Sequence, residues 1–540
     1  MQTKWLLKPC RRVLCPDALR EGNSSATGAQ AVLSQACFGS RWLLLILALC
    51  LTTLPRPAES QEAGYENSWQ KTGRLEAFTI YDDPSGKIGI LLQDGAIQTS
   101  KHPFFRPLAA NGRACVSCHV PENAMGLSTA SLRERWNLRG AKDPVFAPSD
   151  GSDCPTLPVE QESSHSLLLT RGLFRIALPW PPRDPHGSVI KPEFDIEVVR
   201  DPTGCNRDPV YGVTGTHPHV SVYRRPRITA NLKYILNFPN EYKYGFNVKT
   251  AFAQPRAPDG SGVYSMNLMA DARAVGLQEQ HEGAIADHMP GAKKLSAADM
   301  DVLTRFTQQI YAAQVEDKSG GNLIEPGGPT GLGPLNLSKA DTGFSGEAID
   351  TPVFQHFEQW KGNSDSPPSS ATAAFRASVA RGSDLFVQRT FLVRDVAGIN
   401  NIGVGNPAKR ACALCHNAQM TGHDLAPGWM NIGTNTWPWA SNDQDLPQFK
   451  LTCRPDAPAH PYLGRVIYTS DPGRALISGK CSEIGMITMQ QFRGLAARAP
   501  YFSNGSAKTL REVIDFYDRR FQIGYTEQEK QDLVNFMSVL

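Results

Sequence analysis

The chain lacks a hydrophobic run long enough to cross a bilayer comfortably. The uncharged apolar stretch from Trp42 to Leu54 has 13 residues, whereas a spanning helix needs about 20. No glycine-rich nucleotide-binding fingerprint stands out, and 55 Lys and Arg against 52 Asp and Glu leave a net charge of only +3. This charge neither favours nor excludes a nucleic acid or an anionic membrane, and we expect no nucleic-acid partner.

Cysteine and histidine are scarce, with 12 of each in 540 residues, yet they coincide twice in the pattern Cys-x-x-Cys-His. This pattern is typical of c-type haem attachment. Two thiols at this spacing bind the two vinyl groups of one porphyrin, and the adjacent histidine binds its iron. A zinc or redox pair is the alternative, but neither copy has a second Cys-x-x-Cys partner nearby. The sequence therefore predicts two covalent haems, on Cys115, Cys118 and His119 and on Cys412, Cys415 and His416.

The N-terminus has the features of an export signal. Arg41 precedes the apolar run, and Ala58-Glu59-Ser60 follows it as a small-x-small cleavage site. Haem attachment of this kind needs an extracytoplasmic compartment, so we predict a leader over 1–60 and a bacterial periplasmic protein. An uncleaved membrane anchor is the alternative; after cleavage no stable membrane span would remain.

The cysteines outside the haem motifs suggest disulfides. Four lie in the leader and four belong to the motifs, which leaves four of the 12. In an oxidising compartment an even remainder favours two disulfides. Of the three pairings we favour Cys154–Cys205 and Cys453–Cys481, because each closes a loop within one haem-bearing half. Four free buried thiols are the alternative.

The mature chain is long enough for two or three domains. We predict a mainly α fold with two cytochrome c-type haem domains, long loops and a large irregular insertion that contains short strands. The N-terminal haem domain covers 61–330, with the insertion at about 140–262. A linker at 331–372 leads to the C-terminal haem domain at 373–540.

Local patterns predict individual elements within these domains. Short strands are expected at 88–92, 194–199 and 220–223. Helices are expected at 269–286, 296–314, 373–387 and 509–517. Ser296-x-x-Asp299 and Thr526-x-x-Glu529 read as capping boxes at two helix starts.

Three segments resemble the bacterial di-haem cytochrome c peroxidase and MauG superfamily. The most specific is 492–506 (FRGLAARAPYFSNGS), continued by 509–517 (TLREVIDFY). The stretch 271–283 (DARAVGLQEQHEG) and, more loosely, 224–231 (RRPRITAN) also resemble it. Large insertions occur in the similar latex-cleaving rubber oxygenases and di-haem fatty-acid dioxygenases. The resemblance implies a di-haem oxidoreductase, but it does not choose between these branches.

The resemblance implies that Gln280 is the catalytic glutamine of the first haem site, with an ordinary helix-surface position as the alternative. The family's partner glutamate maps near Pro290 and is absent. That carboxylate moves the proton needed for O–O heterolysis, so heterolysis should be slower unless Glu282, Asp287 or His288 substitutes. This departure weakens the simple peroxidase reading and strengthens an oxygenase one.

The family's distal histidine is missing from the matching stretch 125–136. We therefore expect the N-terminal haem to be five-coordinate, with an open face for peroxide or dioxygen. The alternative is that a histidine of the insertion fills the position, and the insertion supplies His165, His186, His217 and His219.

At the second haem, Tyr517 stands where the peroxidases have a distal methionine, and it resembles the tyrosine ligand of MauG. A phenolate ligand would stabilise ferric iron and lower its potential, whereas a thioether raises it. The alternatives are a packed tyrosine whose hydroxyl meets a polar partner and a thioether ligand from Met486 or Met489.

Together these features predict an enzyme that activates H₂O₂ or O₂ at the N-terminal haem and passes electrons through the C-terminal haem. Its partner would be a small redox protein or an organic substrate. Two alternatives stay open: a di-haem oxygenase of an apolar or aromatic substrate, and a non-catalytic two-haem electron carrier. Proteins of this family often hold calcium between their domains. The family's calcium-ligand pattern is not clearly present near 224–231, so calcium is possible here but unsupported.

Overall fold

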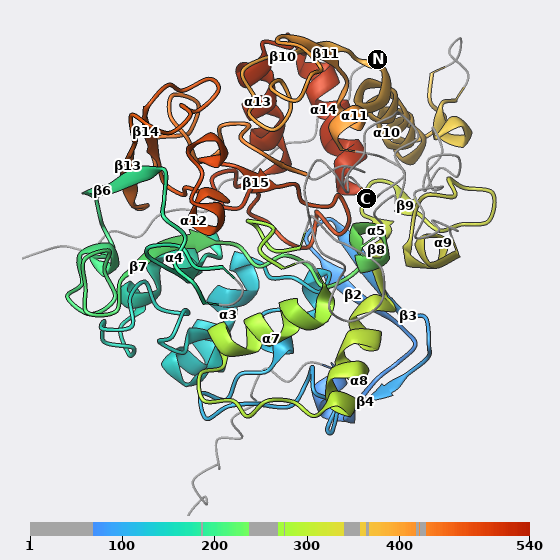
Figure 1. Cartoon of the computed structure of the whole chain (residues 1–540). Helices are drawn as coiled ribbons and strands as arrows, with labels where there is room; N and C mark the ends of the chain where they lie inside the picture. Colours follow the sequence, from blue (N-terminus) through green and yellow to red (C-terminus); the bar gives the residue numbers. More distant parts are fainter. Residues whose placement is uncertain are drawn as a thin grey trace, which may run out of the picture. The chain divides into compact units, whose positions relative to one another are not determined.

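Strands make up a substantial part of the fold (Figure 1). The computed structural model describes residues 68–184, 187–236, 268–274, 276–339, 357–362, 367–416, 421 and 428–540, which all belong to one unit, Gly64–Leu540. Of the described residues, 32% are helical and 20% are extended. The fold is therefore mixed α/β, and the expectation of a mainly α fold is wrong. The predicted leader at 1–60 lies outside the described residues.

A four-stranded antiparallel sheet explains part of this error. Its order is β2 (Phe78–Asp83), β3 (Gly86–Leu92), β8 (Ile310–Asp317) and β9 (Gly321–Asn322). The strand expected at 88–92 is confirmed as part of β3. The helix expected at 296–314 ends earlier, because α8 (Ala297–Gln308) is followed directly by β8. β8 is buried along almost its whole length, so it lacks the alternation that distinguishes a strand from a short buried helix.

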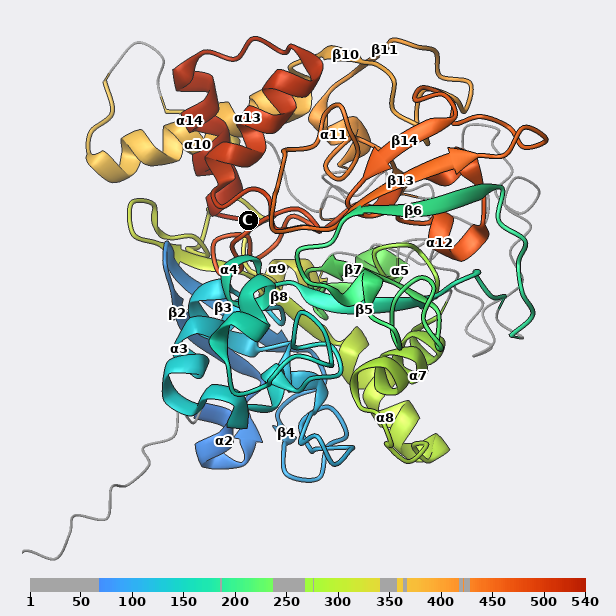
Figure 2. The same ribbon diagram turned by 90° about the vertical axis from the view of Figure 1, so that its left-hand side faces the viewer.

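The insertion also forms β-sheets, and one of its strands pairs with a strand of the C-terminal region. β5 (Phe174–Pro179) pairs with β7 (His219–Arg224). β6 (Phe194–Arg200) pairs instead with β13 (Gln448–Cys453), which pairs with β14 (Val466–Thr469) (Figure 2). Apolar side chains of these strands share one core cluster that includes Phe194, Val222, Phe449 and Ile467. The strands expected at 194–199 and 220–223 are thus confirmed, and β6 connects the insertion to the C-terminal part of the chain.

Helices dominate the C-terminal region. α10 (Ala371–Gln388) packs along α14 (Glu527–Ser538), and α13 (Leu510–Phe521) packs beside α14. The helices expected at 373–387 and 509–517 are confirmed. Both predicted helix starts are capped, but the full capping box forms at one of the two: Ser296 accepts from the Asp299 N–H without the reciprocal bond, whereas Thr526 and Glu529 make the reciprocal pair. The helix expected at 269–286 begins later, as α7 (Leu277–His288).

Shorter elements connect these layers. The short helices are α2 (Ser68–Thr72), α3 (Thr129–Arg139), α4 (Ser166–Arg171), α5 (Leu232–Leu236), α9 (Pro334–Lys339), α11 (Cys412–Cys415) and α12 (Ala475–Ser478). The short strand pairs are β1 (Arg74–Leu75) with β4 (Ile97–Gln98), β10 (Phe391–Val393) with β11 (Ala408–Arg410), and β12 (Trp429–Met430) with β15 (Ile487–Thr488). Among the described helices, none combines the length and apolarity needed to cross a bilayer.

Candidate functional site

The first Cys-x-x-Cys-His motif lies on the wall of a large cavity. Residues Cys115–Ser117 form one 3₁₀ turn, and Cys115, Cys118 and His119 all line a cavity of about 1470 Å³. Nδ1 of His119 lies 3.3 Å from the carbonyl oxygen of Met125. Such a contact commonly orients a histidine that binds a metal through its other ring nitrogen.

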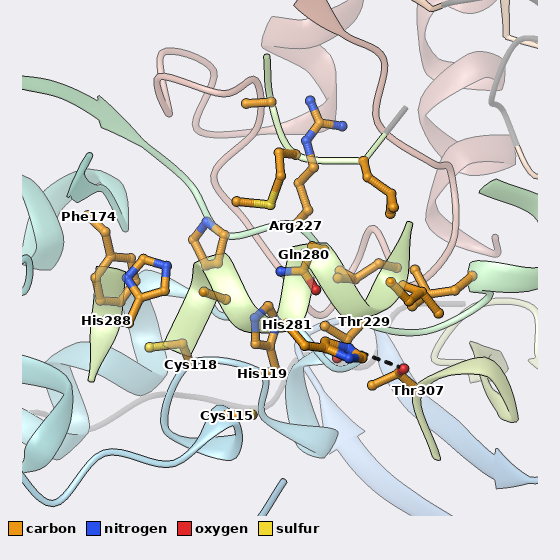
Figure 3. A pocket seen from close by; sticks show the side chains of 18 of the residues that line it. Cys115, Cys118, His119, Phe174, Arg227, Thr229, Gln280, His281, His288 and Thr307 are labelled. Carbon is orange, nitrogen blue, oxygen red and sulfur yellow. Dashed lines mark hydrogen bonds between the residues drawn. The ribbon is translucent and has the colours of Figure 1, made fainter. Parts of the chain in front are cut away.

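Helix α7 turns one face toward this cavity (Figure 3). Its cavity-lining residues recur at helical spacing: Leu277, Gln280, His281, Ala284, Ile285 and His288. The predicted catalytic residue Gln280 therefore shares a cavity with His119 and both motif cysteines. Its catalytic role stays a prediction, while its position beside the motif is a property of the structure.

His281 is a second polar residue on this face of α7, and the sequence reasoning did not single it out. The residue is 7% exposed, and its Nε2 lies 3.4 Å from the Thr307 hydroxyl. Its buried Nδ1 has no hydrogen-bond partner among the described residues. Burial lowers the pKa of both His281 and His119 to about 4, so both rings are neutral at neutral pH. The i, i+4 spacing of Leu277, His281 and Ile285 is the signal that would have found it.

His288 ends α7 and also lines the first cavity. Its Nδ1 forms an ion pair with the Asp150 carboxylate, and Asp150 is buried and also pairs with Arg113. Of the three residues considered as substitutes for the missing glutamate, His288 alone lines the cavity. The side chains of Glu282 and Asp287 are 53% and 49% exposed.

The described histidines of the insertion do not line this cavity. His165 is buried, and its ring nitrogens lie 2.7 Å and 2.8 Å from the carbonyl oxygens of Gly151 and Val159. His217 and His219 are absent from the cavity lining. His186 lies outside the described residues. Among the described residues, the histidines that share this cavity with His119 are therefore His281 and His288, both from α7.

Three arginines bring positive charge to the wall of the first cavity. The guanidinium groups of Arg225, Arg227 and Arg498 donate to backbone carbonyl oxygens at 2.5–3.2 Å. Within the described residues none of them pairs with a carboxylate, and the buried Nε of Arg227 has no partner. Burial lowers the pKa of Arg225 and Arg227 to about 9 and that of Arg498 to about 10. Because an uncompensated buried cation is costly, these residues suit an anionic group, and the propionates of a haem fit that requirement.

The second motif lines a second cavity of about 1390 Å³. α11 is a single helical turn, so Cys412 and Cys415 reach the same cavity as His416. The Phe492 ring stacks on the His416 ring with centroids 4.4 Å apart. None of the four motif cysteines takes part in a disulfide.

Tyr517 extends from α13 into the second cavity and meets the motif histidine. Its hydroxyl lies 3.3 Å from Nε2 of His416, so the residue predicted as the second axial ligand faces the predicted first one. Burial raises the pKa of the Tyr517 hydroxyl above its ordinary value, and the nearby thiols of Cys412 and Cys415 raise it further. Met489 also lines this cavity, but Met486 does not.

The two cavities adjoin. Gln490, Gln491 and Arg498 line both of them. Gln491 is buried and is held from the N-terminal side of the chain, because its amide donates to the Ala230 carbonyl at 2.7 Å and accepts from Asn231 at 3.0 Å. The segment that carries Gln490 and Gln491 is thus a fixed partition between the two motifs.

Both predicted disulfides form. Cys154 pairs with Cys205, with Cα atoms 5.1 Å apart, and Cys453 pairs with Cys481, with Cα atoms 5.8 Å apart. This pairing is the one favoured from the sequence, and it leaves the four motif cysteines for another role.

Comparisons with known proteins add little to this geometry. No protein-family model matches the chain, and no curated protein matches it. Among solved structures, hydrazine synthase of Kuenenia stuttgartiensis, pressurized with 20 bar xenon, covers 82% of this chain and 98% of its own. Its sequence identity is 12% and its TM-score is 0.28, a level of similarity that carries no argument about function.

Proposed function

We propose that the chain is a di-haem c-type oxidoreductase of the bacterial periplasm. It activates H₂O₂, or O₂, in the first cavity and passes electrons through the second. One observation carries the proposal: each Cys-x-x-Cys-His motif places two thiols and an imidazole on the wall of one large cavity, and the two cavities share Gln490, Gln491 and Arg498. Two redox groups on either side of a shared wall exchange electrons over a short path.

The motif residues hold the two haems. Cys115 and Cys118 would form the thioether bonds to one haem, and Cys412 and Cys415 those to the other, while His119 and His416 would each bind an iron. When bound, each haem supplies an iron that accepts and releases single electrons and, at a vacant position, binds a small oxidant. The uncompensated arginines of the first cavity neutralise the propionates and replace the hydration those carboxylates lose.

The side chains of the first cavity orient a small oxidant and exclude water. Leu277, Ile285 and Leu303 give the lining apolar surface, which restricts bulk water. The Gln280 amide is both a donor and an acceptor, so it can hold a peroxide oxygen on the cavity side of α7. A few fixed polar groups in an apolar lining are typical of sites that bind small molecules.

The second cavity is built for electron transfer. The Tyr517 hydroxyl lies beside Nε2 of His416, and aromatic rings such as Phe492, Phe502 and Phe521 fill the surrounding wall. A phenol held at this place competes with external ligands. The residues of the second cavity would therefore hold a haem that stores or relays an electron, and the oxidant would react in the first cavity.

Haem content and coordination test the proposal. A pyridine haemochrome assay of protein produced with c-type maturation should give two haems per chain, and Cys412→Ser/Cys415→Ser should leave one. The EPR spectrum of the ferric protein should show a high-spin signal from the first haem, which persists in that double variant. Fewer than two haems in the unaltered chain would refute the proposal.

The reaction itself separates the peroxidase from its alternatives. We expect H₂O₂ consumption that depends on a reduced small redox protein. Label from ¹⁸O₂ in an organic product would instead show an oxygenase. Two six-coordinate irons that bind neither peroxide nor cyanide would show an electron carrier.

A further inference from the structure

A buried carboxylate holds one histidine in place at the edge of the first cavity. Asp150 is 4% exposed; one of its oxygens pairs with Arg113 and the other with Nδ1 of His288. Arg113 is 1% exposed and also donates to the carbonyl oxygens of Pro144 and Val145, at 2.8 Å each. Arg113, which is itself held by these backbone carbonyls, thus fixes the carboxylate beside the imidazole.

The backbone of His288 is fixed by the same cluster. Its carbonyl oxygen accepts from the Asn111 amide at 3.0 Å and lies 3.4 Å from Arg113 Nη1. Burial opposes ionisation of Asp150, but the charges of Arg113 and His288 outweigh it and keep the pKa of Asp150 below its ordinary value. An ionised Asp150 accepts the Nδ1–H of His288, which makes Nε2 the basic nitrogen of the neutral ring.

His288 is accessible from the cavity, although its partners are not. The His288 side chain is 28% exposed and lines the cavity together with His119 and Cys118, as Figure 3 shows. Among the described residues, the titratable groups that face it are Asp150 and Arg113 from neighbouring segments, and the neutral ring of His119, whose pKa is lowered by burial and further by the charge on His288. A carboxylate, an imidazole and an open cavity in this order form the arrangement by which proteins move protons at a reacting group.

We propose that His288 is the proton-transfer residue of the first cavity and that Asp150 is its positioning residue. This inference rests on the proposed function and deepens it. Peroxide reduction consumes two protons and two electrons: H₂O₂ + 2 H⁺ + 2 e⁻ → 2 H₂O. His288 accepts the proton from one peroxide oxygen and returns it to the other as the O–O bond breaks, so that this oxygen leaves as water. The other oxygen becomes the second water with the two protons and two electrons of the equation; both protons come from solvent, and the electrons come from a reduced one-electron redox protein.

Cyanide binding tests the proton step without turnover. HCN must lose its proton to bind ferric haem as cyanide, so a nearby base accelerates association. In the holoprotein, His288→Gln should slow cyanide association at neutral pH by roughly 10²-fold, the lower end of the usual contribution of a general base. Peroxide reduction should slow by a similar factor. Glu282→Gln is the matched control on the same helix, and it should leave both rates unchanged.

Asp150→Asn tests the positioning role. Loss of the negative charge removes the group that stabilises the protonated imidazole, so the midpoint of the pH profile for cyanide association should move to lower pH. A merely structural role for Asp150 would lower the haem content and leave that midpoint in place, which would overturn this part of the proposal.

A second variant distinguishes the loss of the imidazole base from a folding defect in His288→Gln. In His288→Gly, added imidazole should restore part of the cyanide association rate, and the haem content should match that of the unaltered protein. If the unaltered protein binds cyanide rapidly and His288→Gln does so equally fast, the role of His288 is wrong while the proposed function stands. If the unaltered protein carries no haem with an open position, both are wrong.

Discussion

Tyr517 is the residue whose replacement should most change the proposed second haem. Its hydroxyl lies 3.3 Å from Nε2 of His416, so Tyr517→Phe removes the oxygen and leaves the aromatic packing. We expect the potential of that haem to rise by on the order of 0.1 V, a fraction of the roughly 0.8 V range that axial ligands give haem proteins. The ferric EPR signal of this haem should change in the same variant. Redox titration followed by absorbance measures the shift.

Tyr525→Phe is the control for this change. Tyr525 lines the same cavity, and its hydroxyl lies 3.9 Å from the Cys412 sulfur rather than beside His416. The control should keep the potential and the EPR signal of the unaltered protein. A Tyr517→Phe protein with an unchanged spectrum would show that Tyr517 is only a packed tyrosine.

The residues of the two sites differ in how far the sequence could predict them. Cys115, Cys118 and His119 are recognisable as a predicted haem site because such a site needs two thiols and a histidine within five residues, so the chemistry sets the local spacing. Asp150 and His288 are 138 residues apart, and only the tertiary fold brings them together. No spacing rule relates such residues, which is why sequence reasoning named His288 as one of three candidates and did not indicate Asp150 at all.

At the scale of elements, the contact between α10 and α14 depends on a glycine. A Cβ at Gly382 would lie 2.1 Å from the carbonyl oxygen of Asp532 and 2.7 Å from the Phe536 Cβ. Gly382→Ala therefore forces the two helices apart, and we expect the free energy of unfolding to fall by about 1–3 kcal/mol, as in other overpacked cores. Urea unfolding followed by circular dichroism measures the change.

Gly283→Ala is the matched control, because this glycine also lies inside a helix. A Cβ at Gly283 of α7 meets nothing within 4 Å, so the substitution should raise the free energy of unfolding by about 0.5–1 kcal/mol through the helix preference for alanine. A loss of stability in Gly283→Ala as large as that in Gly382→Ala would contradict the role assigned to the α10–α14 contact.

Elements that depend on a few neighbouring residues of the sequence were predicted well. Strands whose formation depends on pairing with distant segments were not. Ser296 and Thr526 are helix caps in both sequence and structure, because a cap needs only the next three residues. β8 was missed because its apolar residues face neighbours on both sides. The pairing of β6 with β13 joins positions about 250 residues apart, and neither strand alone specifies its partner.

At the scale of the whole molecule, a buried ion cluster links three distant segments. Arg224 ends β7 and is 3% exposed; it pairs with Asp471 at 2.6 Å and with Asp271 at 2.5 Å. Asp271 also pairs with Arg273 at 2.9 Å. The cluster therefore joins the insertion to the segment before α7 and to the C-terminal region, next to the walls of the first cavity that Arg224 and Arg273 line.

Asp271→Asn should weaken this link in a way that depends on pH. Burial raises the pKa of Asp271, but the charges of Arg273 and Arg224 overcome it and hold that pKa well below the ordinary value. A depressed pKa means that the carboxylate stabilises the fold above the unfolded-state value of about 3.9, and that this stabilisation is lost as the pH falls toward the folded-state pKa. At neutral pH the variant should lose about 3 kcal/mol of free energy of unfolding, because a buried cation loses a partner.

The difference in the free energy of unfolding between the unaltered protein and Asp271→Asn should shrink below about pH 4, by up to about 1.4 kcal/mol per pH unit for the single proton involved. Urea unfolding at a series of pH values measures it. Asp287→Asn is the control, since Asp287 contacts the same Arg273 at 3.4 Å from a side chain that is 49% exposed, and exposed pairs contribute roughly 0–1 kcal/mol. A difference that stays constant from neutral to acidic pH would mean that packing around Asp271, and not its charge, holds these segments together.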